Sequence, residues 1–179
     1  KYCGAGSGHH AGPRSALPFS SRGVWRPSRG AWRHHGVMGL LTDYFIAPDD
    51  AAAAGVVSQG PASTFPTVEG NGIEPTVHLG TLEEILTGRS FDDILADDSD
   101  PIAHEDDYNM LVLPVSTHLL DALQVSSSDS LADAAVRWSQ TDELAGSDPK
   151  PLAEFLAALA ELARTARSTG SSVYCWVCV

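Results

Sequence analysis

The stretch from Asp148 to Val179, DPKPLAEFLAALAELARTARSTGSSVYCWVCV, decides the fold of this chain. Asp-Pro is a typical helix start, because an Asp side chain caps the first turn and Pro fits its first position. Gly170 is a typical C-terminal stop. The sequence therefore predicts a long helix that starts at Asp148-Pro149 and ends at Gly170. Its apolar positions follow the i, i+3, i+4, i+7 spacing of an amphipathic helix: Leu152, Phe155, Leu156, Leu159, Leu162, Ala163 and Ala166.

The residues after this helix, Ser172 to Val179, predict a strand. Both alternating faces of the segment are apolar, which is typical of a strand that is covered on two sides. We therefore expect a buried, central strand at the end of the stretch.

Shorter patterns upstream predict the remaining elements. Apolar runs at 40–47 and 109–113 indicate two more strands, and Pro114 ends the second. The segments 58–72 and 97–107 are predicted loops. Capping residues followed by apolar spacing indicate five further helices: one from Asp49 or Asp50 to about Val57, one at 76–87 ended by Gly88, a short one after Ser90, one after Ser116, and one after 126–129 that runs to about Thr141.

These elements predict a mixed α/β (α+β) fold, a single compact domain in which a small sheet packs with several helices. A chain of 179 residues with 43% hydrophobic and 19% charged residues fits one soluble globular domain. No run approaches the about 18 apolar residues of a membrane helix, and no secretory signal is evident. Three cysteines cannot all pair within one chain, so we expect a reducing, cytoplasmic location.

Charge divides the chain near Met38. Residues 1–37 hold six Lys or Arg and no acid, whereas residues 38–179 hold all 23 acids and five Lys or Arg, a formal charge of −18. The basic segment is rich in Gly, Ser and Pro and has no periodic apolar pattern, so it cannot build a core. It fits a disordered tail, a targeting peptide or a non-native extension. We favour the extension, with an acidic globular domain over 38–179.

Cys175 and Cys178 have the spacing of redox pairs and zinc knuckles, but their context differs. A redox cysteine needs a helix N-terminus, and on a strand the two side chains point to opposite faces, too far apart for a disulfide. Zinc would need two more ligands, and only Cys3, His78, His104 and His118 are candidates, without paired spacing. We therefore interpret both as buried structural cysteines, with metal and redox roles as the alternatives.

A second candidate is an acidic segment between positions 92 and 107. It lacks the third acid and the glycine of a helix-loop-helix calcium site, and spacing alone selects no catalytic pair of carboxylates. We predict a solvated surface. Its acids are Asp92, Asp93, Asp97, Asp98, Asp100, Glu105, Asp106 and Asp107.

Other signatures of chemistry are missing from the acidic domain. It contains no serine-hydrolase elbow and no phosphate-binding glycine loop, and His104 and His118 alone do not make a triad. A domain with this negative charge repels nucleic acid, and it favours a basic protein partner instead. We expect no cofactor and no catalytic or metal-binding residues.

The order of several short motifs resembles the YfbM-like bacterial domains of unknown function. The motifs are the opening Met38-Gly39-Leu40-Leu41-Thr42-Asp43-Tyr44-Phe45, the helix end Leu86-Thr87-Gly88, and the turn at Pro114 into Ser116-Thr117-His118-Leu119-Leu120. Members similarly finish with a long helix that leads into an apolar strand. The resemblance spans residues 38–179 and implies a mixed α/β fold, and the family supplies no established catalytic residues.

Three functions compete on these observations. The first, which we favour, is a non-enzymatic binding module for a basic protein. The second is an immunity-type protein that neutralises a basic toxin. The third is a hydrolase or metal-dependent enzyme that uses His104 or His118 with neighbouring acids.

Overall fold

The computed structural model describes residues 24–25, 39–70 and 72–179, and it shows a mixed α+β fold. Its sheet has the strand order β1-β3-β2-β6-β5-β4. Strand β1 pairs with β3 in parallel, and every other pair of neighbouring strands in the sheet is antiparallel. The strands are β1 (Val24–Trp25), β2 (Leu41–Ala47), β3 (Thr67–Glu69), β4 (Ala103–Glu105), β5 (Met110–Pro114) and β6 (Ser172–Cys178).

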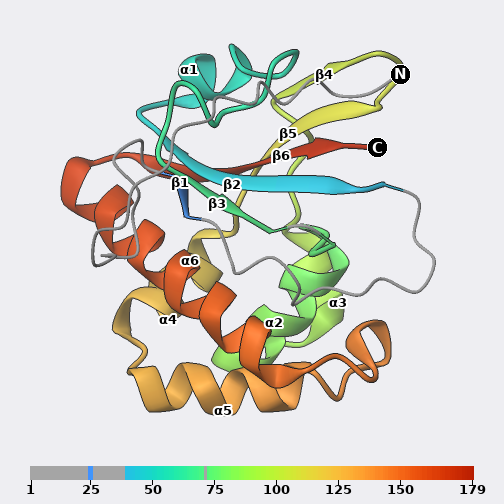
Figure 1. Ribbon diagram of the computed structural model, residues 1–179, viewed down its shortest axis with the longest axis vertical. Coiled ribbons are helices and arrows are strands. Elements are labelled where there is room, and N and C mark those ends of the chain that lie inside the picture. The colour runs from blue at the N-terminus through green and yellow to red at the C-terminus, as the bar shows by residue number, and fades with distance from the viewer. Residues whose placement is uncertain (1–23, 26–38, 71) are drawn as a thin grey trace, which may run out of the picture.

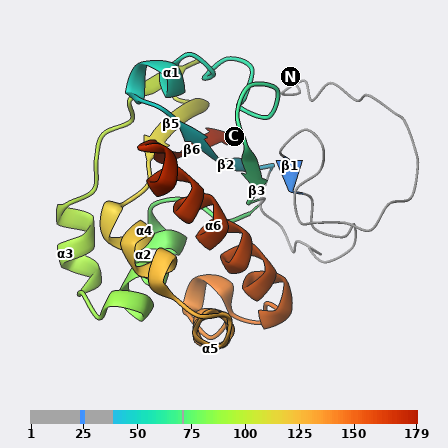
Figure 2. The same cartoon turned by 90° about the vertical axis from the view of Figure 1, so that its left-hand side faces the viewer.

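The helices of the described residues cover both faces of this sheet. Helix α1 lies on one face, and α2 to α6 lie beyond the other (Figure 1). The turned view shows α6 running obliquely down from the sheet, with α2 and α4 beside it and α3 farther out (Figure 2). Their bounds are α1 (Asp50–Ala54), α2 (Val77–Thr87), α3 (Phe91–Ala96), α4 (Thr117–Val125), α5 (Ser128–Trp138) and α6 (Pro149–Thr169), with a 3₁₀ turn at Asp142–Leu144.

Strand β6 is central, as the sequence predicts. It pairs with β2 along its whole length and with β5 along most of it, and its residues from Val173 to Cys178 are buried. Alternate side chains enter two separate cores: Cys175 belongs to the larger one under α6, and Cys178 to the smaller one under α1. Because both faces of β6 carry apolar side chains, each face needs a covering layer. Leaving one uncovered would lose about 25 cal/mol of stabilisation for each Å² of apolar surface exposed to water.

The capping predictions are confirmed at the atomic level. Asp148 accepts a hydrogen bond from the backbone of Lys150 at the start of α6, and Gly170 ends the helix in the left-handed conformation. Asp49, Ser90 and Ser116 cap α1, α3 and α4 in the same way. Local sequence therefore determines where most of the helices begin.

Two predicted loops are wrong, because each contains a strand. Thr67–Glu69, within the predicted loop 58–72, is β3, and Ala103–Glu105, within the predicted loop 97–107, is β4. Each has only three residues, too few to show an alternating pattern, and the pairing with β2 or β5 creates them. Helix α1 is also shorter than expected, since turns replace helix after Ala54.

The structure describes two residues of the basic segment, Val24–Trp25, whose backbone pairs with β3 as the edge strand β1. The other residues of 1–37, including Cys3, lie outside the described residues. Whether that segment is an extension of a domain that starts at Met38 stays a prediction.

No helix in the described part of the chain is both long and apolar enough to cross a membrane.

Gly70 provides a test of this packing. A Cβ at Gly70 would lie 2.4 Å from the ring of Tyr44, a buried side chain whose hydroxyl donates a 3.0 Å hydrogen bond to the Ile73 carbonyl. Because that ring cannot move aside, we expect Gly70→Ala to lower the free energy of unfolding by about 1–3 kcal/mol in urea denaturation. Gly55→Ala, where the added Cβ meets nothing closer than 3.4 Å, should change it by less than about 0.5 kcal/mol. Equal effects of the two substitutions would contradict this packing.

Candidate functional site

A pocket of about 370 Å³ lies between α2, α3 and the start of α4. Its walls come from three stretches: 75–83 with Arg89, 94–99, and 114–119. The short connection between α2 and α3 forms it, because Gly88 adopts the left-handed conformation that ends α2 and Ser90 caps α3 two residues later. Helix α3 is thereby folded back beside α2, and a hollow remains in front of α4.

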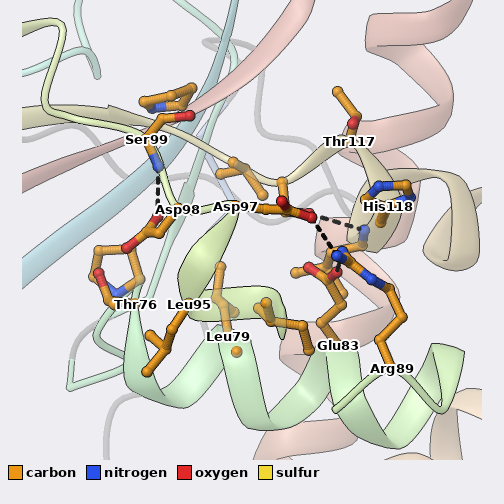
Figure 3. Close-up of a pocket in the computed structure, with 17 residues that line it drawn as sticks. Thr76, Leu79, Glu83, Arg89, Leu95, Asp97, Asp98, Ser99, Thr117 and His118 are labelled. Carbon is orange, nitrogen blue, oxygen red and sulfur yellow. Dashed lines mark hydrogen bonds and ion pairs between the residues drawn. The ribbon is translucent and has the colours of Figure 1, made fainter. Parts of the chain in front are cut away.

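An ion triad of Glu83, Arg89 and Asp97 occupies one end of the pocket (Figure 3). Arg89 donates to Glu83 Oε1 through Nη1 at 2.8 Å and to Asp97 through Nη2. The hydrogen bond to Asp97 raises the pKa of Arg89 against the opposing effect of desolvation, and the one to Glu83 adds to the rise. The guanidinium is therefore a permanent cation shared by two carboxylates.

Glu83 is the buried member of this triad. Its side chain is 1% exposed, whereas that of Arg89 is 25% and that of Asp97 is 61% exposed. Oε1 accepts the hydrogen bond from Arg89, and no described residue donates one to Oε2. A buried carboxylate is costly unless its oxygens are paired, so the Arg89 contact is what makes this position tolerable.

The rest of the pocket combines apolar walls with further polar groups. Leu79, Ile94 and Leu119 are buried residues that line it. Asp98, which accepts a 3.0 Å hydrogen bond from the backbone of Ser99, lies toward the other end in the view of Figure 3. His118 lines it from the first turn of α4. The pocket lining thus contains three carboxylates, of Glu83, Asp97 and Asp98, and a single arginine. Its formal charge is therefore negative.

A second polar arrangement lies where α2 begins. His78 Nδ1 accepts a 2.8 Å hydrogen bond from the backbone N–H of Glu74, and the Glu74 carboxylate caps the helix by accepting from Thr76 and Val77. Desolvation lowers the pKa of His78, while Glu74 and Glu143 act in the opposite direction. A neutral imidazole is required here, because a protonated Nδ1 cannot accept a hydrogen bond.

The structure separates the two histidines that the sequence offered for catalysis. His118 is exposed and lines the pocket, whereas His104 lies on β4 and stacks on Tyr108 with a ring separation of 4.0 Å. No carboxylate of the described residues forms a hydrogen bond with His118. The pocket therefore holds no histidine-carboxylate pair of the kind that general base catalysis uses.

Cys175 and Cys178 point into opposite cores, as the strand geometry predicts. Cys175 is a free thiol. Desolvation raises the pKa of the Cys175 thiol well above its ordinary value, and the neighbouring Tyr44 acts in the opposite direction. Cys175 is therefore a poor thiolate nucleophile. These are the properties of a packing residue.

The acidic segment between Asp92 and Asp107 is exposed at all eight acids. Among them only Asp97 forms an ion pair with another described residue. The described residues contain no group of three or more His, Cys, Asp or Glu side chains that could hold a metal ion. The segment is a solvated anionic surface beside the pocket.

Glu83 and Arg89 are not among the residues that the sequence patterns indicated. A signal for Glu83 was present, because it stands four residues after Leu79 and three before Leu86, on the apolar face of the predicted helix. A buried acid on that face requires a cation or a donor beside it. No local pattern indicated Arg89 as that partner.

Comparisons with protein-family models, with curated proteins and with solved structures find no match to this chain.

The triad makes a prediction about stability. Arg89→Met removes the cation and leaves Glu83 buried without a charged partner, so it should lower the urea midpoint more than Asp97→Asn, which leaves an oxygen that can accept from Arg89. The double variant Arg89→Met/Glu83→Gln should recover part of the loss. Chemical denaturation of the three variants measures this, and an Asp97→Asn effect as large as that of Arg89→Met argues against a buried pair.

His78 makes a prediction about pH. Its pKa in the folded protein lies below the unfolded value of about 6.5, so the unfolded state binds the proton more tightly. The free energy of unfolding should therefore fall as pH drops below about 6.5 toward the folded pKa. His78→Gln should flatten this slope, and His118→Gln, at an exposed position, should leave it unchanged. Parallel slopes for wild type and His78→Gln would rule out His78 as the cause.

Proposed function

We propose that this chain is a non-enzymatic binding module for a basic protein. The observation that carries the proposal is the exposed acidic segment at 92–107, which adjoins an anionic pocket and pairs with a described cation only at Asp97. Such a surface attracts a cationic partner and accelerates encounter with it.

The distribution of cations supports this proposal. Of the five Lys or Arg among residues 39–179, three already form ion pairs: Arg89 with Glu83 and Asp97, Arg164 with Glu161, and Arg167 with Asp121. Arg137 donates to the carbonyl of Ile85 on a neighbouring helix. The cations of residues 39–179 are thus largely engaged internally, and the acids of the 92–107 segment other than Asp97 form no ion pair with a described cation.

The same features weigh against other partners and against catalysis. A phosphate backbone would meet the acidic segment with like charge, which makes nucleic acid an unfavourable ligand. Asp97 is held by Arg89, and His118 has no carboxylate partner among the described residues, so neither is prepared for proton transfer.

We also propose that the chain is a bacterial protein related to the YfbM-like domains. The support is its motif order: Leu86-Thr87-Gly88 forms the end of α2, and Ser116 opens α4 after the β5 strand.

An affinity capture from the source cells, followed by mass spectrometry, tests the function. We expect a protein of high isoelectric point to be retained at about 0.1 M salt and released at about 1 M, where the Debye length shrinks from about 10 Å to about 3 Å. Recovery of no basic protein at either salt concentration, or equal retention at both, contradicts the proposal.

A variant of the acidic segment tests whether this surface attracts the partner, because it removes charge without changing the pocket. Asp106 and Asp107 lie at the tip of the β4–β5 hairpin with φ of 52° and 53°, a conformation that Asn also tolerates. Asp106→Asn/Asp107→Asn should therefore fold as the wild type does and should retain less of the basic partner at low salt. Undiminished retention would show that the acidic segment is not the attracting surface.

A further inference from the structure

We propose that the pocket between α2, α3 and α4 receives the cationic end of one Arg or Lys side chain of the basic partner. This inference deepens the proposed function and depends on it for the source of the side chain. Three observations carry it: the charge of the triad, a carboxylate oxygen in the pocket without a donor, and the character of the walls.

The charge balance of the pocket leaves room for one more cation. Arg89 is a single positive charge between Glu83 and Asp97, and Asp98 adds a third carboxylate to the same walls. A second guanidinium or ammonium would lower the formal excess of negative charge in the pocket from two to one. Because the site is partly withdrawn from water, such a pairing is screened less than one on the open surface.

The hydrogen-bonding capacity of Glu83 points to the same class of ligand. Its carboxylate is 1% exposed and lines the pocket, and Oε1 is used by Arg89. Oε2 receives no donor from the described residues, and none of their side-chain oxygens or nitrogens is both fully enclosed and without a partner. Because Glu83 lines the pocket, a ligand that enters it can donate to Oε2. A ligand that fills this position must be a donor, and Arg and Lys end in donors only.

The shape of the pocket suits a long side chain with a charged tip. Its volume of about 370 Å³ is within the range of about 300–1,000 Å³ for ligand pockets. Leu79, Ile94 and Leu119 offer an apolar surface for an aliphatic stem, and Leu95 at 42% exposure lies at the opening. Glu83 and Asp97 lie with Arg89 at one end, where the tip of such a side chain would arrive, and Asp98 lies toward the other end (Figure 3).

An anion is the opposite possibility, because the first turn of α4 also lines the pocket and the N-terminus of a helix favours negative charge. An anion could reach Arg89 only by displacing Asp97, and it would then lie beside the buried Glu83. Repulsion between the anion and the Glu83 carboxylate would oppose binding, so the geometry favours a cation.

Amide-detected NMR titration of the full chain tests the inference directly. The probes are N-acetyl-arginine methylamide, its neutral isostere N-acetyl-citrulline methylamide, and inorganic phosphate. We expect the arginine probe to shift the amides of Leu79, Asp97 and Asp98, and the other two probes to leave them unmoved. Absence of pocket shifts with the arginine probe, equal shifts with citrulline, or saturable shifts with phosphate would each overturn the proposal.

Charge-matched variants give the second arm. Asp97→Asn/Asp98→Asn should weaken binding of the arginine probe at least about fivefold, the effect of about 1 kcal/mol from exposed ion pairs. Asp106→Asn/Asp107→Asn removes the same charge outside the pocket and should change the affinity less than twofold, on the order of the long-range screened effect. Equal weakening by both variants would show that the probe senses only the overall charge.

The two proposals fail separately. If the arginine probe titrates the pocket but no basic protein is captured, the pocket inference stands for a free guanidine and the protein partner is wrong. If a basic protein is captured and Asp97→Asn/Asp98→Asn retains it as the wild type does, the acidic surface binds it without the pocket, and the inference is wrong.

Discussion

The burial of β6 on both faces is the constraint on which the rest of the structure depends. Its Val173, Cys175 and Val177 face one core and its Tyr174, Trp176 and Cys178 face the other. The second face needs polar partners as well as apolar ones, because Tyr174 donates to Asp50 at 2.7 Å and Trp176 Nε1 to the Val57 carbonyl at 2.7 Å. Helix α1 and the turns after it are held over the sheet by these two contacts.

On the opposite face, α6 lies against the sheet, so the remaining helices must pack around it. Helix α4 contacts both α2 and α6, and α5 closes against α6 and α2. Trp138 of α5 donates to the His78 carbonyl at 3.0 Å and thereby holds α2 in this layer. Helix α3 follows α2 after the short turn at Gly88 to Ser90 and packs beside it, and the pocket is the space that this arrangement leaves before α4.

The buried Glu83 is what gives that space a chemistry. An apolar residue at this position of α2 would pack without a partner, and the fold gains no evident stability from an acid there. Keeping it requires Arg89, and Arg89 in turn holds Asp97 at the end of α3. The triad therefore joins both ends of α3 to α2 and sets the negative charge of the pocket at once.

The sequence was most informative where the signal is local. Asp148 and Gly170 determine the ends of α6, and the two-faced apolar pattern of β6 indicates its central place. Strands β3 and β4 could not be found, because three residues carry no period and their pairing comes from distant strands.

The candidate site was harder to predict than the fold. His118 was singled out and does line the pocket, but the partnership of Glu83 with Arg89 depends on the left-handed turn at Gly88, which brings two unremarkable residues together. The exposed acids, by contrast, followed from composition alone, since a run with so many carboxylates is solvated by default.

The central claim is that the anionic pocket accepts a cation beside the Glu83 carboxylate. A crystal structure of the protein grown with N-acetyl-arginine methylamide tests it most directly. We predict a guanidinium within hydrogen-bond distance of Glu83 Oε2 and an aliphatic stem against Leu79. The ion pair between Arg89 and Glu83 should remain intact. A guanidinium bound only outside the pocket, or a Glu83 Oε2 satisfied by another residue of the chain, would contradict it.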